Sequence, residues 1–190
     1  MTDTSFSQLS AWQRAAFCLS IAERNHVHVL MVCELNEPEA INSQPYTKLT
    51  NKMWAYLTGE LKSEKNLQRF IEEFYQWQEL NFAELESFGE QAAAITRQAL
   101  TSACDSLFDD SLDECELVSQ SIFELLDDLL ELQGEDAQED INQLKQLETD
   151  FQQEVLSKLQ TINQRGNKSI MELRKLAGSE KMSSIGITYD

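Results

Sequence analysis

The stretch Ser111–Gln133, SLDECELVSQSIFELLDDLLELQ, constrains the fold more than any other part of the chain. On a helical wheel its apolar residues fall within about half of the circumference, and carboxylates fill the other half. An apolar arc of that width exceeds the seam of a coiled coil and indicates contact with two or more neighbouring helices. We therefore expect one side of this helix in the core, with most of the chain packed around it. The carboxylates on the other side are those of Glu124, Asp127, Asp128 and Glu131.

The rest of the chain also shows helical spacing of its apolar residues, and only 6 of the 190 residues are Gly and 2 are Pro. So few turn-forming residues favour helices. The run His26–Leu35, HVHVLMVCEL, is rich in β-branched residues, but a lone strand would have no partner, so we predict a helix there. The predicted helices run from Ser5 or Ser7 to Asn25, then over 26–35, 46–61, 66–77, 86–109, 111–133 and 139–178.

These segments predict an all-α fold, with a single domain over residues 1–190. The expected architecture is a bundle of about seven helices with a long C-terminal helix and a short extended tail. The apolar stripe from Ile141 to Ala177 keeps its phase across Gly166. A broken helix has no reason to keep phase, so we expect one helix of about 40 residues, with Gly166 facing the core. The tail, residues 179–190, has alternating apolar residues and is expected to lie extended against the body.

The net charge of −18 is concentrated in one region, since residues 105–140 hold 14 of the 33 acidic residues and no Lys, Arg or His. Nucleic acid is therefore not an expected partner, because phosphate contacts need clustered Lys and Arg. The acidic face would suit a protein partner with a basic surface, or it serves only to keep the protein soluble. The sequence leaves homo-oligomerisation open.

No apolar run approaches the roughly 20 residues of a membrane span. The amino terminus, MTDTSFSQLSAWQR, lacks the basic region and apolar stretch of a signal peptide. We therefore expect a soluble, cytoplasmic protein with no membrane partner. The four cysteines form no C-x-x-C pair, which fits reduced thiols in the core. They are Cys18, Cys33, Cys104 and Cys115.

Few residues in the chain are suited to catalysis or metal binding. Glu23 and His26 form one Glu-x-x-His pair, whereas a di-iron bundle needs two such pairs and two further carboxylates. The other histidine, His28, has no glutamate three residues before it. The chain also lacks a glycine-rich phosphate loop, a Walker lysine and a dinucleotide fingerprint. We expect no metal, no cofactor and no catalytic residues, and the sequence leans away from an enzyme.

The candidate binding residues come from the aromatic-rich first half of the chain and from one charged pair. Trp12 and Trp54 would line a pocket or a partner groove, the alternative being core packing. A pocket near Glu23 and Arg24 would suit a small ligand or a substrate, although a buried Glu–Arg pair more often serves structure. These four residues are the binding candidates.

Scattered motifs cover nearly the whole chain: Trp12-Gln13, Phe17, Glu23-Arg24, Trp54, Phe88-Gly89 and Ser184-Ile185-Gly186-Ile187. Together they resemble the YjaG-like family of bacterial proteins, a family of unknown function. The resemblance implies an all-helical protein of a gammaproteobacterial cytoplasm. Gene neighbourhoods of the family linked to histidine kinases imply a signalling-accessory role. The resemblance supplies no catalytic residues, because the family has none assigned.

Three functional hypotheses follow from these observations. The first is a non-enzymatic protein-interaction or signalling-accessory module, supported by the segregated acidic face and the missing catalytic motifs. The alternative is a small-ligand-binding protein or an enzyme with a pocket near Glu23 and Arg24. The third is mimicry of nucleic acid by carboxylates spaced like phosphates along one exposed ridge, although acidic helix faces are common.

Overall fold

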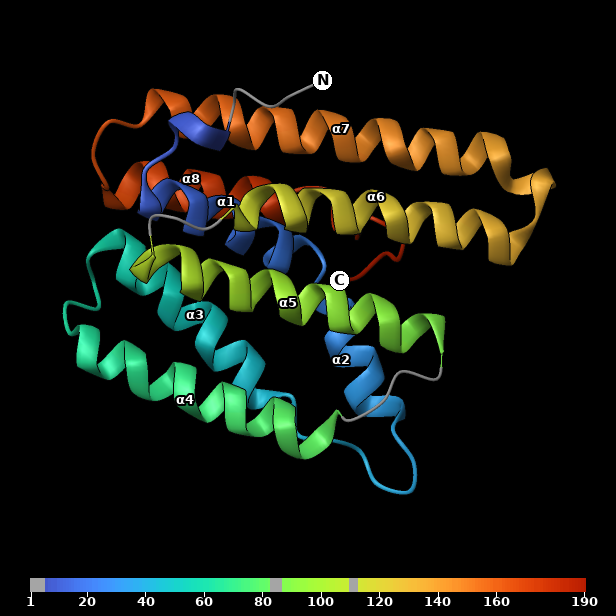
Figure 1. Cartoon of the computed structure of the whole chain (residues 1–190), viewed down its shortest axis with the longest axis horizontal. Helices are drawn as coiled ribbons and strands as arrows, with labels where there is room; N and C mark the ends of the chain where they lie inside the picture. Colours follow the sequence, from blue (N-terminus) through green and yellow to red (C-terminus); the bar gives the residue numbers. More distant parts are fainter. Residues whose placement is uncertain (1–5, 83–86, 110–112) are drawn as a thin grey trace.

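The structure, a computed structural model, describes residues 6–82, 87–109 and 113–190. Over these residues it confirms the all-α fold, with eight α-helices and no strand apart from one isolated bridge between Met182 and Thr188 (Figure 1). None of these helices is long and apolar enough to cross a membrane. The α-helices are α1 Ala11–Arg24, α2 His26–Leu35, α3 Gln44–Thr58, α4 Glu64–Asn81, α5 Phe88–Phe108, α6 Glu114–Gln133, α7 Gln138–Thr161 and α8 Asn167–Ala177; the short 3-10 helices are η1 Phe6–Gln8 and η2 Glu135–Ala137.

The central helix is α1, not α6 as the sequence predicts. Every residue from Ala15 to Ala22 is buried, and α1 contacts α2, α3, α5, α6, α7 and α8. Figure 1 shows α1 in the middle of the bundle, with α7 on one side and α2, α3 and α4 on the other, while α6 and α8 overlap it in this view. The reason is the size of its side chains, because residues such as Ala16, Cys18 and Ser20 let neighbouring helices approach from all around.

Helix α6 nevertheless has the two faces that its sequence predicts. It packs against α1, α5 and α7, so its wide apolar arc does meet more than one neighbour. One edge of that arc stays in water, since Leu132 is 66% exposed. On the opposite side Glu124, Asp127 and Glu131 are exposed, and Asp128 is half-buried. Its buried residues are Cys115, Val118, Ile122, Leu125, Leu126 and Leu129.

The predicted C-terminal helix of about 40 residues is wrong, because α7 ends at Thr161 and α8 begins at Asn167. The Gln13 amide of α1 donates to the carbonyl of Leu159 over 2.7 Å and to that of Ile162 over 3.2 Å. The Leu159 carbonyl also accepts from the Ile162 N–H over 3.2 Å, so Gln13 adds donors at the end of α7. Both helices bury one face against the same bundle, so the apolar stripe continues in phase across the break.

Gly166 is the residue that caps the amino terminus of α8, rather than a core position inside a helix. Its φ of −141° and ψ of 144° are extended values that any residue adopts. A Cβ added there would meet no heavy atom within 4 Å. The prediction that Gly166 lies inside a continuous helix and faces the core is therefore wrong.

Helix α1 begins later than predicted, with Ser10 as its amino-terminal cap. The Ser10 backbone N–H donates to Gln13 Oε1 over 2.8 Å, which is half of a capping box. Ser7 lies in η1 instead, and Ser5 lies outside the described residues. Gln13 thus links the start of α1 to the end of α7 through opposite ends of one amide.

The tail packs against the body as expected, but it folds back on itself instead of lying fully extended. The Ser183 N–H donates to the Ile187 carbonyl over 2.8 Å, and the Gly186 N–H donates to the Ser183 carbonyl over 3.0 Å. Gly186 has a φ of +83°, which favours glycine. Ser183 and Ser184 at the start of this turn are buried.

The four cysteines are free and buried, as the sequence predicts. The closest pair is Cys18 and Cys115, whose sulfur atoms lie 3.9 Å apart where α1 meets α6. Burial is the main reason that the pKa of Cys18 lies well above its usual value. These thiols therefore serve as small core side chains.

Candidate functional site

A cavity of about 870 Å³ lies where α2, the start of α5, the end of α6 and the tail meet. It sits toward the end of the bundle where α5 begins and α6 ends (Figure 1). The side chains that α2, α5, α6 and the tail contribute are mostly apolar, and they include Met31, Leu35, Phe88, Leu129 and Ile185. A cavity of this size and lining is typical of small-molecule sites in proteins.

His28 is the buried polar residue of this cavity, and only 3% of its surface is exposed. Its Nδ1 lies 3.1 Å from the Thr96 hydroxyl oxygen, and that hydroxyl donates to the Ala92 carbonyl over 2.8 Å. The other ring nitrogen, Nε2, is buried and has no hydrogen-bond partner.

Burial lowers the pKa of His28 from 6.5 to about 4, so the ring is neutral near pH 7. The low pKa also makes His28 a weak general base. Nor do His, Cys, Asp and Glu side chains of the described residues gather in groups of three or more that would hold a metal ion.

The cavity lining is negatively charged overall. Glu37 and Glu90 line it, whereas no Lys or Arg does. The Glu90 carboxylate accepts from the backbone N–H of Ser87 over 2.8 Å and from its hydroxyl over 3.0 Å, which caps the start of α5. Glu37 is exposed just after the end of α2. These carboxylates disfavour an anion in the cavity.

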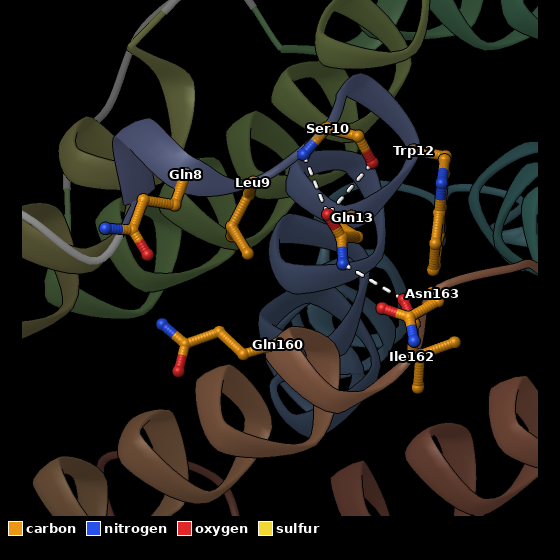
Figure 2. Close-up of a pocket in the computed structure, with 8 residues that line it drawn as sticks. All are labelled: Gln8, Leu9, Ser10, Trp12, Gln13, Gln160, Ile162 and Asn163. Carbon is orange, nitrogen blue, oxygen red and sulfur yellow. Dashed lines mark hydrogen bonds between the residues drawn. The ribbon is translucent and has the colours of Figure 1, made fainter.

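A second cavity, of about 420 Å³, lies between the start of α1 and the end of α7 (Figure 2). Trp12 lines it, so one of the four binding residues predicted from the sequence does face a cavity. Figure 2 shows the Gln13 side chain between Ser10 and the end of α7, with its amide already hydrogen-bonded at both ends. The polar groups at its centre therefore hold two helices together and leave little for a ligand.

Glu23, Arg24 and Trp54 line neither of these two cavities, and helix packing directs Arg24 away from the other two. Glu23 accepts from the indole N–H of Trp54 over 2.9 Å and from Nε of Arg174 over 3.2 Å, which joins α1 to α3 and α8. Arg24 reaches α7 instead, where its Nε lies 3.4 Å from Glu148 Oε2. The expected pocket near Glu23 and Arg24 gains no support from this arrangement.

The acidic face of α6 is partly neutralised by neighbouring helices. Lys145 of α7 forms an ion pair with Asp127. The Gln91 amide of α5 donates to Asp128 over 2.5 Å. Glu124 and Glu131 complete the face as exposed carboxylates. The predicted row of carboxylates exists, but two of its four members also hold α6 against its neighbours.

The sequence indicated His28 only as a histidine without a metal-binding partner. A polar side chain in the middle of the apolar run HVHVLMVCEL was the available signal, because such a residue on a buried helix needs a specific hydrogen bond. The bond partner, Thr96, is 68 residues away along the chain.

Fold and cavity together define an all-helical bundle protein with an apolar, histidine-containing cavity at one end. The chain belongs to the DUF416 family: the profile of that family, described as a protein of unknown function, matches residues 2–188. The expectation of a family of unknown function is thereby confirmed, and the narrower YjaG-like label stays a prediction.

The fold is shared with a solved structure of the same family. It is the crystal structure of a DUF416 family protein from Shewanella baltica OS155, which is 17% identical, with a TM-score of 0.76 over 100% of this chain and 99% of that chain. At this level of identity the likeness shows the fold alone. No curated protein matches the chain.

Proposed function

We propose that this protein is a non-enzymatic binding protein whose ligand is a small molecule held in the cavity beside His28. The observation that carries the proposal is a cavity of about 870 Å³ with a largely apolar lining, in which Met31 and Leu35 are 39% and 70% exposed. Exposed apolar side chains gathered in a concave site mark a surface that a ligand covers.

Binding without catalysis agrees with the chemistry of His28. Thr96 occupies one nitrogen, and burial keeps the pKa of the ring too low for efficient proton transfer near pH 7. This proposal keeps the ligand-binding hypothesis drawn from the sequence, but moves its site from Glu23 and Arg24 to His28.

The test is a nuclear magnetic resonance titration of the full chain with a set of small apolar molecules. Backbone shifts are expected to change in α2, at the start of α5, at the end of α6 and in the tail. Val32 lines the cavity and is half-buried, so Val32→Trp should fill the space and abolish the changes. Leu80→Trp is the control, because Leu80 is 84% exposed on α4 and lines neither of the two cavities. Binding that survives Val32→Trp would refute the proposal.

A second candidate function is contact with a basic protein surface through α6. It is supported by the exposed carboxylates of Glu124, Asp127 and Glu131 within the acidic region of the chain. We propose to compare the wild-type protein with the triple variant Glu124→Gln, Asp127→Asn, Glu131→Gln in binding to immobilised basic proteins at low and moderate salt. Equal retention of the two proteins would count against an acidic docking face. The link to histidine kinase signalling and homo-oligomerisation stay predictions.

A further inference from the structure

We infer that the guanidinium of Arg97, on α5, binds a small oxyanion, a phosphate or a carboxylate, either free or as a group on a larger molecule. Arg97 does not line the His28 cavity, so this inference is independent of the proposed function. Three observations carry it: a buried cation without a partner, surroundings without an anionic side chain, and an edge of the guanidinium that still meets solvent.

Arg97 is a buried cation that lacks a partner. Only 5% of its surface is exposed, and its Nε is enclosed without a hydrogen-bond partner. None of the ion pairs among the described residues includes Arg97. A guanidinium carries five N–H donors, and charged side chains are almost never fully buried unless they are paired. An anion from outside the chain would supply the missing acceptor.

The surroundings of Arg97 offer no negative charge in place of such an anion. Burial lowers the pKa of Arg97 to about 10, so the guanidinium stays charged near pH 7. The side chains that act on it electrostatically are Cys33 and Tyr46, and both are neutral near pH 7 because burial raises their pKa. The other fully buried arginine with a known partner, Arg24, faces the carboxylate of Glu148. The chain has 33 acidic residues, yet Arg97 is left without one.

One edge of the guanidinium is accessible. Phe82 covers a face of it, with 3.7 Å between Cζ and the ring centre. Of its three nitrogens only Nε is both enclosed and unpartnered, so the terminal nitrogens keep contact with solvent. Ala94 and Thr101, about one turn before and after Arg97, are half-buried, which places Arg97 at the margin of the buried face of α5.

The geometry of this edge selects the class of ligand. Stacking on an aromatic ring uses the face of a guanidinium and leaves the N–H groups in its plane available. Two such N–H groups, side by side, match two oxygens of a phosphate or a carboxylate. The positive charge favours an anion over a neutral acceptor. A small oxyanion therefore satisfies both the charge and the donors of Arg97.

The test is a titration of the full chain with sodium phosphate and with sodium acetate near neutral pH, each balanced with sodium chloride to constant ionic strength. The Nε–H resonance of Arg97 is expected to shift saturably. Arg97→Met keeps an apolar side chain against Phe82 and should weaken phosphate binding at least about tenfold, the factor for one charge-assisted hydrogen bond. Arg69→Met is the control, because Arg69 also lies over a ring, that of Phe70, but is 63% exposed and paired with Glu73.

The results decide the inference whether or not the variant folds. Saturable binding of phosphate or acetate that Arg97→Met weakens and Arg69→Met does not supports it. The absence of saturable binding for both anions overturns it, as does binding that Arg97→Met leaves unchanged. Phosphate should also raise the melting temperature of the wild-type protein and not that of Arg97→Met. Should Arg97→Met fail to fold, Arg97→Lys keeps the charge without the planar fork, and phosphate affinity equal to that of the wild type would overturn the inference.

Discussion

The Arg24 guanidinium lies against the Glu148 carboxylate, with 3.4 Å between Nε and Oε2, and the two side chains are only 2% and 0% exposed. The same carboxylate accepts from the Ser184 hydroxyl and from the Gln152 amide, each over 2.7 Å. The guanidinium also stacks over the Phe151 ring, 4.4 Å from its centre. Three segments that are distant in the sequence, α1, α7 and the tail, therefore share one buried polar cluster.

This cluster fixes the wall of the His28 cavity. Asn25, which follows Arg24, accepts from the Ser184 backbone N–H and donates to its hydroxyl, in both cases over 2.9 Å. Ile185, the next residue of the tail, lines the cavity. Changes to the buried cluster should consequently weaken ligand binding as well as stability.

The first prediction concerns the buried pair of Arg24 and Glu148. Arg24→Met should lower the free energy of unfolding by about 3–5 kcal/mol, because it leaves a buried carboxylate without its cation. Burial already raises the pKa of Glu148 despite the guanidinium and the two hydrogen bonds. The double variant Arg24→Met, Glu148→Gln should lose less than the sum of the single variants, by about 1–3 kcal/mol. Urea unfolding of the four proteins measures this, and additive losses would contradict the pairing.

A pair of glycine variants tests the turn of the tail. Gly186→Ala should destabilise by about 1–2 kcal/mol, since its φ of +83° is unfavourable for alanine. Its Cβ would also lie 3.3 Å from a methyl carbon of Leu144. Gly166→Ala is the matched control with extended backbone and open space, and it should change stability by less than about 0.5 kcal/mol. Equal effects in thermal unfolding would argue against this turn.

Gln13 should be a stability determinant although it is a polar residue near the surface. Gln13→Ala removes the bonds to the Leu159 and Ile162 carbonyls and to the Ser10 N–H, so we expect a loss of about 1–3 kcal/mol. Hydrogen exchange should also quicken at the end of α7. Gln160→Ala provides the control in the same cavity, since Gln160 is exposed, and it should have little effect. Similar losses in the two variants would show that the amide does not cap α7.

The apolar periodicity of the sequence predicts which face of a helix is buried, but not which helix lies in the centre. The buried leucines of α6 follow from their spacing, and the helix over His26–Leu35 is confirmed. The central place of α1 depends on tertiary packing around its small residues, which periodicity does not express. At the break after Thr161 the Leu159 carbonyl accepts from Gln13, which is 146 positions away in the sequence. The residues around Thr161 do not indicate that bond.

The candidate site was less predictable because it depends on contacts between distant segments. Glu23 and Arg24 are neighbours in the sequence, yet successive helical residues point about 100° apart, and they contact different helices. The acidic face could be predicted because all four carboxylates lie on one helix. His28 lines a cavity only because α5, α6 and the tail meet beside α2. Its hydrogen-bond partner, Thr96, is likewise distant in the sequence.

The last prediction is a pH dependence that His28 should impose on stability. Burial lowers the pKa of His28 from 6.5 to about 4. At pH values between these two, the unfolded chain therefore binds a proton at His28 that the folded protein does not bind. Stability should therefore fall as the pH drops from about 6.5 to about 4, by up to about 3 kcal/mol, and this contribution should be constant below that range. Unfolding in urea at several pH values, for the wild-type protein and for His28→Phe, isolates the effect as the difference between their two curves.

The other titrating groups cancel in that difference. Glu148 has the opposite sign, because an acid whose pKa is raised by burial loses stability as the pH rises, and it is present in both proteins. His28→Phe leaves the Thr96 hydroxyl donating to the Ala92 carbonyl, so no new unpaired donor arises. The variant should be relatively more stable toward pH 4. Parallel curves for wild type and His28→Phe would mean that His28 titrates in the folded protein as it does in the unfolded chain, and that its ring is not shielded from water.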